Sequence, residues 1–223
     1  MQPGKPLIDF SWIAEHLDDV GVRILQHLEL TILPLILGFV ISLILSIWAV
    51  RQPRVYGPVT AVTGILYTIP SLAAFALLIP ITKLSLITAL IPLTTYTLLI
   101  FVRNIVAGFN AVPADVLEAA EGMGYTRRQR LIRVELPLAI PLMLAGLRLA
   151  SVTTIGLATI VSVLGDSFGG LGQLITEGLQ TFFPTKYLLG AVLSVVLAFA
   201  ADFLFVRFER LVTPWAHARA GAR

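Results

Sequence analysis

The sequence predicts an all-helical membrane protein with five transmembrane helices, and three observations support this prediction. Of its 223 residues, 57% are hydrophobic and only 13% are charged, whereas a soluble domain is usually about half apolar and about a quarter charged. Five apolar runs are each long enough to cross a bilayer. The basic residues lie mostly on one side of these runs.

The five helices follow from length, because about 20 apolar residues in a helix cross roughly 30 Å of hydrocarbon. They cover residues 30–50, 59–80, 84–102, 139–164 and 187–206. Since only a few residues separate the second and third runs, we expect these two to form a tight helical hairpin. Neighbouring helices of a bundle can accommodate proline kinks, which are expected at Pro34, Pro70, Pro92 and Pro141.

The basic residues predict the orientation of these helices. One side of the runs carries eleven of them, which are Arg51, Arg54, Arg103, Arg127, Arg128, Arg130, Arg133, Arg207, Arg210, Arg219 and Arg223. The other side carries four, which are Lys5, Arg23, Lys83 and Lys186. Because cytoplasmic loops are enriched in Lys and Arg, we expect an external N-terminus and a cytoplasmic C-terminus.

The ends of the chain differ from its apolar middle. Residues 1–27 have scattered acids and no long apolar core, so no cleavable signal peptide is predicted. Their apolar positions recur at helical spacing, which is typical of an external amphipathic segment at the membrane surface, with Trp12 near the headgroups. A partly ordered soluble tail is the alternative. We expect residues 28–212 to form the transmembrane domain and residues 213–223 a cytoplasmic tail.

The sequence offers little for catalysis or metal binding. It has no cysteine, which excludes disulfides and thiolate chemistry. Its three histidines, His16, His27 and His217, have no second ligand nearby at metal-binding spacing. It also has no phosphate-binding loop of the form G-x-x-x-x-G-K-S/T. We therefore expect no catalytic residue, metal or bound nucleotide in this chain.

A charged insert, residues 107–137, separates the third and fourth runs. Its stretch EAAEGMGYTRRQRLIRVELP (118–137) carries four arginines and three glutamates. This is too polar to cross a membrane, so we expect it to project from the cytoplasmic face. A solvated loop whose arginines only fix the topology is the alternative. The next transmembrane helix is expected to begin at Pro137.

Local signals predict two short helices in this insert. Pro113 suits the start of the first helix, and Gly122 and Gly124 suit its end. Thr126 and Gln129 then have the spacing of a capping box, which begins a second helix that runs to residue 134. The small and charged faces of these helices would let another protein surface approach closely.

The residue spacing in the insert resembles the cytoplasmic loop of permease subunits in ATP-binding-cassette importers. That pattern is E-A-A, three residues, G, nine residues, an aliphatic residue, any residue and L-P. It is matched by Glu118, Ala119, Ala120, Gly124, Val134, Leu136 and Pro137, with valine where the family usually has isoleucine. In that family the loop forms a coupling helix that docks into a groove of the ATPase. The resemblance therefore implies a type I importer permease fold in which these residues form the docking site.

Four further stretches resemble the osmoprotectant branch of that family, which serves glycine betaine, choline, carnitine or related quaternary amines. They are YTIPSLA (67–73), RNIVAGFNAVPADVLEAAEGMGYTRRQRL (103–131), ELPLAIPLMLAGLRLA (135–150) and GDSFGGLG (165–172). The resemblance implies a multi-pass subunit of a bacterial plasma membrane that is not itself an enzyme. Its implied partners are an ATPase dimer that binds ATP and Mg²⁺, a second permease chain, identical or similar, and an extracytoplasmic substrate-binding protein. Nucleic acid is not among them.

A path for a quaternary amine is expected to use aromatic faces and small polar groups, because aromatic faces attract cations. The candidates are Tyr67, Thr68, Ser71, Thr94, Thr95, Tyr96 and Asn104. For each tyrosine, a place in the core or at the membrane interface is the alternative. If selection resides in the external binding protein, the permease has no strong site of its own.

Two other features invite an interpretation. Arg148 and Asp202 lie within predicted spans, where charge is costly, so they are expected either to pair or to extend toward the interface. Residues 165–186 are too long for a simple turn, and within them residues 171–183 suggest a short helix across the outer face. That segment would serve either as a docking surface for a binding protein or as a plug over the outer mouth.

Three other classes of function remain as alternatives. A secondary transporter would show inverted repeats and intramembrane ion ligands, which five spans with one Asp and one Arg fit poorly. A membrane-embedded enzyme would need catalytic groups gathered at one depth. An ATP-driven permease for another solute, such as an amino acid, methionine or ergothioneine, is the strongest competitor.

Overall fold

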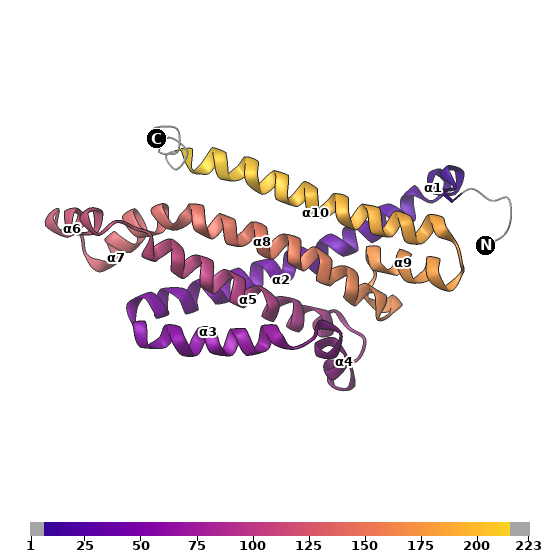
Figure 1. The fold of residues 1–223 in the computed structure, drawn as a ribbon, viewed down its shortest axis with the longest axis horizontal. Helices are drawn as coiled ribbons and strands as arrows, with labels where there is room; N and C mark the ends of the chain where they lie inside the picture. Colours follow the sequence, from indigo (N-terminus) through magenta and orange to yellow (C-terminus); the bar gives the residue numbers. More distant parts are fainter. Residues whose placement is uncertain (1–6, 215–223) are drawn as a thin grey trace.

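The computed structural model describes residues 7–214, and each regular element in that range is helical (Figure 1). The long helices are α2 (Leu17–Arg51), α5 (Leu86–Asn110), α8 (Leu136–Val163) and α10 (Pro184–Val212). The shorter ones are α1 (Phe10–Glu15), α3 (Pro53–Thr68), α4 (Ser71–Thr82), α6 (Ala114–Gly122), α7 (Arg127–Arg130) and α9 (Leu171–Gln180). A π-helical turn (Leu131–Glu135) joins α7 to α8, and a 3₁₀ turn (Asp166–Phe168) precedes α9. The predicted all-helical class is confirmed, while nearly all of the expected tail at 213–223 lies outside the described residues.

Helix α5 is packed between α2 and α8. Phe101 of α5 is fully buried in an apolar cluster that includes Leu35 of α2 and Met143 of α8. Phe39 of α2 packs edge-on against Phe101, with ring centroids 5.5 Å apart. Because close-packed side chains resist displacement, this cluster fixes α8, which leads out of the charged insert, against the rest of the bundle.

The second predicted span, residues 59–80, is not one continuous helix, and its bend lies at Pro70, where a kink is expected. The chain forms α3 and α4 instead, and the two are bent by 88° at Ile69 and Pro70. Proline has no N–H and disfavours a helical conformation in the residue before it, and Ile69 accordingly has ψ 126°. Among the described residues, four helices are long and apolar enough to cross a membrane, or five if the bent pair is one span.

Other predicted boundaries also shift. Helix α2 begins at Leu17, so the latter part of the expected external segment belongs to the same helix as the first predicted span, and only the short α1 precedes it. The connection between α4 and α5 is short, as predicted. Helices α7 and α8 and the π-helical turn between them form one helical stretch from Arg127 to Val163. Helix α8 begins at Leu136, one residue before the predicted start at Pro137, but it continues α7 and is not a separate helix.

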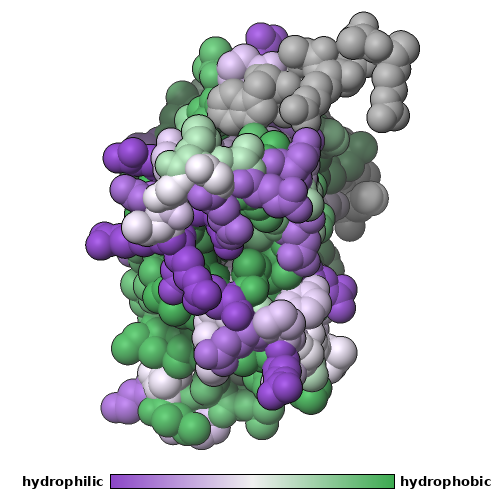
Figure 2. Space-filling view, turned by 90° about the vertical axis from the view of Figure 1, so that its left-hand side faces the viewer, coloured by the Kyte–Doolittle hydropathy of each residue, from purple (hydrophilic) through white to green (hydrophobic). Residues whose placement is uncertain are grey.

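The two ends of the bundle carry different elements. Helices α1 and α9 and the start of α10 lie at one end, here called the α9 end (Figure 1). Helices α6 and α7 and the end of α10 lie at the other, here called the insert end. Figure 2 looks onto the insert end and shows hydrophilic side chains gathered across it, with hydrophobic ones visible between them.

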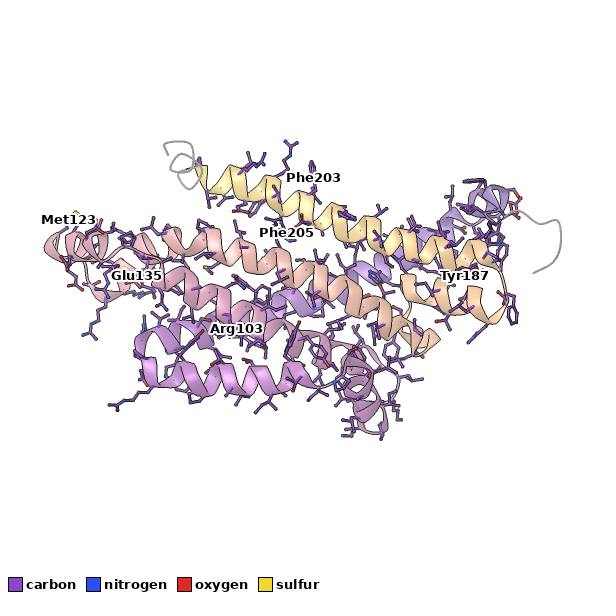
Figure 3. All side chains as sticks on the ribbon, viewed as in Figure 1. Arg103, Met123, Glu135, Tyr187, Phe203 and Phe205 are labelled. Atoms are coloured by element: carbon purple, nitrogen blue, oxygen red, sulfur yellow. The ribbon has the colours of Figure 1, made fainter. Side chains whose placement is uncertain are left out.

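Helix α10 packs against α8 and α9, and much of its remaining surface is apolar and exposed. Phe203 lies on the side that faces away from α8 (Figure 3) and is 57% exposed. The other exposed apolar side chains of this helix are Val192, Val195, Val196, Phe199, Leu204, Phe208 and Leu211. In a membrane, lipid chains or another apolar helix would cover such a surface.

Candidate functional site

The first half of the charged insert is α6 and the turn that ends it. Helix α6 starts directly after Pro113, as expected for a proline at a helix start. At its end, Gly124 has φ +78° and donates its N–H to the Glu121 carbonyl at 2.9 Å. Tyr125 donates to the Ala120 carbonyl at 3.1 Å. Because a positive φ favours glycine, Gly124 fixes the direction in which the chain leaves α6.

The seven residues that match the family pattern form two groups by exposure. Glu118, Ala119 and Gly124 are exposed on the insert. Ala120 is only 1% exposed, and Val134, Leu136 and Pro137 are partly buried. Helix α6 packs on α7 and the π-helical turn. The first group is therefore available to a partner, whereas the second attaches the insert to the bundle. Met123 is exposed at the tip of the insert (Figure 3).

The second half of the insert begins as predicted but ends differently. Thr126 and Gln129 form both hydrogen bonds of a capping box, so this prediction is confirmed. Past α7 the helix widens, and the Leu136 N–H bonds to the Leu131 carbonyl five residues earlier. Pro137 follows at once, and a proline ring crowds the carbonyl of the preceding turn. The wider π-helical turn accommodates that ring, so the helix continues into α8 without a break.

Ion pairs that the sequence did not indicate connect the two halves of the insert. The Arg130 guanidinium contacts the Glu121 carboxylate of α6 and lies 2.7 Å from the Glu135 carboxylate. Glu135 is only 12% exposed, and its charge is paired where burial would otherwise be costly. Arg130 thereby connects α6 to the base of α8. In an α-helix, residues five positions apart lie on different faces, so the sequence does not predict the Arg130–Glu135 ion pair.

The candidate path residues gather only in part. Tyr67 and Tyr96 meet edge to face with ring centroids 5.8 Å apart. The Tyr96 hydroxyl donates to the Ile69 carbonyl at 2.5 Å, where α3 bends into α4, and Ser71 begins α4 just beyond. Tyr67 is 39% exposed and Tyr96 only 5% exposed. The structure thus brings two of the tyrosines together at the bend.

Two further candidate path residues, Thr95 and Asn104, bond to their own helix. Thr95 donates its hydroxyl to the Ile91 carbonyl at 2.7 Å. Asn104 donates its amide to the Ile100 carbonyl at 2.8 Å. It also packs so closely on Gly146 of α8 that a Cβ there would lie 2.6 Å from the Asn104 Cβ. Asn104 is thus part of the α5–α8 contact, about 12 Å along the helix from Tyr96.

Of the two alternatives for Arg148 and Asp202, pairing or extension toward the interface, the structure shows pairing. Two guanidinium nitrogens of Arg148 in α8 lie 3.0 and 2.9 Å from one Asp202 oxygen in α10, and a third lies 3.8 Å from Glu209. Charge-assisted hydrogen bonds of this kind are stronger than neutral ones. They join α10 to α8 near the insert end.

Asp202→Asn is expected to loosen α10. Removing the Asp202 charge leaves Arg148 with only the longer contact to Glu209, so we expect a loss of about 1–3 kcal/mol of stability, measured as a lower melting temperature of the detergent-purified protein. Exchanging the two residues, Arg148→Asp with Asp202→Arg, should recover part of that loss. Arg207→Gln on the same helix is the matched control. No recovery in the exchanged variant would mean that the pair does not stabilise this contact.

At the α9 end, charged and aromatic side chains hold α2, α9 and α10 together. Glu177 of α9 lies 2.8 Å from Arg23 of α2 and 2.8 Å from Lys186 of α10. Lys186 also lies over the ring of Trp12, 5.4 Å from its centroid. Burial alone would raise the pKa of Glu177, but the hydrogen bond from Lys186 and the positive charges of Arg23 and Lys186 lower it below its usual value.

Glu177→Gln is expected to destabilise this end by about 1–3 kcal/mol. Arg23 is only 13% exposed, and in this variant its one remaining ion pair among the described residues is with the half-exposed Asp19. Since the folded protein lowers the pKa of Glu177, the stabilisation is complete above about pH 4.5 and is lost as the pH falls through the lower folded pKa. Melting curves of both proteins should therefore converge in acid. Asp18→Asn, at an exposed acid nearby, is the control, and curves that stay equally far apart at every pH would contradict this prediction.

Within residues 7–214, no three His, Cys, Asp or Glu side chains are grouped so that they could hold a metal ion. His27 is fully buried, and its two ring nitrogens face backbone groups, the Ile155 carbonyl at 3.2 Å and the Leu171 N–H at 3.3 Å. Its role is to join α2 to α8 and α9.

Comparison with known proteins shows which family has this arrangement of helices. Residues 35–214 match the family described as binding-protein-dependent transport system inner membrane component. The carnitine transport permease protein OpuCB of Listeria monocytogenes is 36% identical over 92% of this chain and 93% of its own length. The osmoprotectant import permease protein OsmW of Salmonella typhimurium is 35% identical over 85% of this chain and 89% of its own.

Solved structures share the fold. A chain of the MetNI methionine ABC transporter in an inward-facing conformation superposes with a TM-score of 0.79 at 26% identity, and the match covers 89% of this chain and 98% of that one. A chain of an amino acid ABC transporter superposes with a TM-score of 0.71 at 20% identity, which shows the fold alone.

Proposed function

Because the chain belongs to the family of binding-protein-dependent transport system inner membrane components, we propose that it is the membrane-spanning subunit of an ATP-driven importer for osmoprotectants such as carnitine, glycine betaine or choline. The observation that carries this proposal is the match over most of the chain to permeases named for these solutes. Residues 28–212 then form the transmembrane domain of a bacterial plasma membrane protein, with the insert end in the cytoplasm.

The insert is the element on which an ATPase would act. Glu118, Ala119 and Gly124 supply the surface, because they are exposed beside the tip. The buried Ala120 and the partly buried Val134, Leu136 and Pro137 keep α6 attached to the bundle. ATP and Mg²⁺ belong to the ATPase dimer. When its two halves close, they displace α6, and the movement passes into the membrane as a rigid-body shift.

The force would enter α8 by two routes. One is covalent, since the helix is continuous from Arg127 to Val163. The other is the Arg130 network, which joins α6 to Glu135 at the start of that helix. An element held at two points transmits displacement better than a loop, which would absorb it.

A second permease chain and an external binding protein complete the proposed importer. The exposed apolar side of α10 suits either lipid or a second chain. Gly156 of α8 has open space beside its Cα, whereas Gly146 and Gly190 are packed within this chain. The bent pair α3–α4 would provide the fifth crossing, with Tyr67, Ser71 and Tyr96 at the bend beside the path.

The test is ATPase activity in liposomes that contain this chain, the ATPase encoded beside its gene and the matching binding protein. Carnitine, glycine betaine, choline and methionine are each added with the binding protein. Stimulation by a quaternary amine, lost when both Glu118 and Gly124 are changed, supports the solute class and the coupling role. Stimulation by methionine alone would overturn the solute class, and no association with the ATPase would overturn the role of the insert.

A further inference from the structure

A cavity of about 1020 Å³ lies at the insert end, between the end of α2 and the charged insert. Its lining comes from the last turns of α2, from the end of α5 and from α6, α7 and the π-helical turn. Known small-molecule pockets occupy about 300–1000 Å³, so the cavity has room for a ligand. None of the residues assigned to ATPase docking lines it.

The charges in this lining do not cancel. Arg130 is paired with Glu121 and Glu135, the two acids of the lining. Arg51, Arg127 and Arg128 also line the cavity, and none of them forms an ion pair with an acid among residues 7–214. Four arginines and two glutamates give the lining a net charge of +2, and three of its guanidinium groups, from two separate elements, have no ion-pair partner in the described part of the chain. Arginine binds phosphate through paired hydrogen bonds.

The cavity is also lined by apolar residues. Ile47 and Val50 line it from the end of α2, and Leu131 and Ile132 line it from the π-helical turn. Trp48, half-exposed on the same turn of α2, is of a residue type enriched at membrane–water interfaces. Along α2 the lining passes from Ile47 and Val50 to Arg51, as expected where a helix leaves the bilayer, and Figure 2 shows both hydrophilic and hydrophobic surface at this end.

We infer that this cavity binds the phosphate headgroup of an anionic membrane phospholipid, with the acyl chains against its apolar residues. The inference depends on the proposed function in one respect, because it places the insert end at the cytoplasmic membrane surface. A free phosphate ion would satisfy the arginines but would leave the apolar lining residues uncovered. A bound headgroup would connect Arg51 of α2 to Arg127 and Arg128 of α7, and so hold the insert against the first span.

The test is lipid binding to the full-length purified chain. Native mass spectrometry counts bound phosphatidylglycerol against phosphatidylcholine at equal concentration, and melting temperature is followed with the same lipids and with inorganic phosphate. The variant changes Arg51, Arg127 and Arg128 to glutamine. The control changes Arg54, Arg133 and Arg210 to glutamine, which removes the same charge from outside the cavity.

We expect the wild type and the control to prefer phosphatidylglycerol about tenfold and the variant to lose that preference. Equal loss in the control would overturn the site, because general surface charge would then explain binding. Equal stabilisation by inorganic phosphate would overturn the lipid assignment. Intact lipid binding with lost ATPase association in the variant would assign the arginines to the ATPase instead. Because lipid binding is measured on the permease alone, a failed substrate assay would affect only the proposed function.

Discussion

Arg130→Met is expected to lower substrate-stimulated ATPase activity and transport at least tenfold while the protein still inserts and binds the ATPase. Methionine keeps much of the side-chain bulk but breaks both ion pairs, so α6 is no longer held to the base of α8. It also leaves Glu135, 12% exposed, as an unpaired and largely buried carboxylate, and a group of that kind costs about 1–3 kcal/mol or more. Transport of labelled carnitine into liposomes measures the effect.

Arg133→Met provides the matched control for this prediction. Arg133 lies in the same π-helical turn, is exposed and forms no ion pair among the described residues. The Arg133→Met variant should transport at a rate within about twofold of that of the wild type. If both variants lose activity equally, general positive charge on the insert matters rather than the connection that Arg130 makes. Normal transport by Arg130→Met would show that the continuous helix alone conveys the movement.

Gly124→Val is the second change with a large expected effect. Gly124 has φ +78°, and a β-branched residue in that region is strained by roughly 1–2 kcal/mol or more. No atom lies within 4 Å of a Cβ placed there, so the penalty comes from the backbone and not from a clash. We expect α6 to leave its position, and transport and ATPase association, measured by co-purification, to fall at least tenfold.

Three substitutions of Gly124 distinguish the effect of backbone strain from that of side-chain size. Gly124→Asn should retain the most activity, Gly124→Ala less and Gly124→Val the least, because asparagine tolerates a positive φ better than other side chains. Gly122→Ala is the control, since Gly122 ends α6 and also has open space around its Cα. A loss that follows side-chain volume, with asparagine worse than alanine, would mean that the ATPase surface packs directly on this residue.

The prolines show how far the sequence could predict the fold. The same signal at Pro34, Pro70, Pro92 and Pro141 predicted four kinks, yet only Pro70 breaks the chain into two helices. Pro34, Pro92 and Pro141 lie inside continuous helices. Exposure does not explain the difference, because Pro58 and Pro80 are as exposed as Pro70 and yet lie inside α3 and α4. The presence of a proline therefore does not by itself show whether a helix ends there.

Some features of the insert could likewise be predicted from the sequence, and others could not. Signals that act within a few residues were predictable, namely the capping box at Thr126 and the turn at Gly124, because each is a local backbone preference. The Arg130–Glu135 pair was not, because five-residue spacing brings two side chains to one face only in a π-helical turn. Likewise the matching pattern identified seven residues, but only the fold separates the exposed Glu118 from the buried Ala120.

The uninterrupted helical stretch from Arg127 to Val163 determines how far a displacement at one end can be carried. Its 37 residues extend about 55 Å, well beyond the roughly 30 Å of a hydrocarbon core. A tilt of about 5° around one end of a rod of that length moves the other end by about 5 Å. That far end packs against α9, which Glu177 joins to α2 and α10. A movement of the insert end would therefore reach the α9 end through one continuous helical stretch.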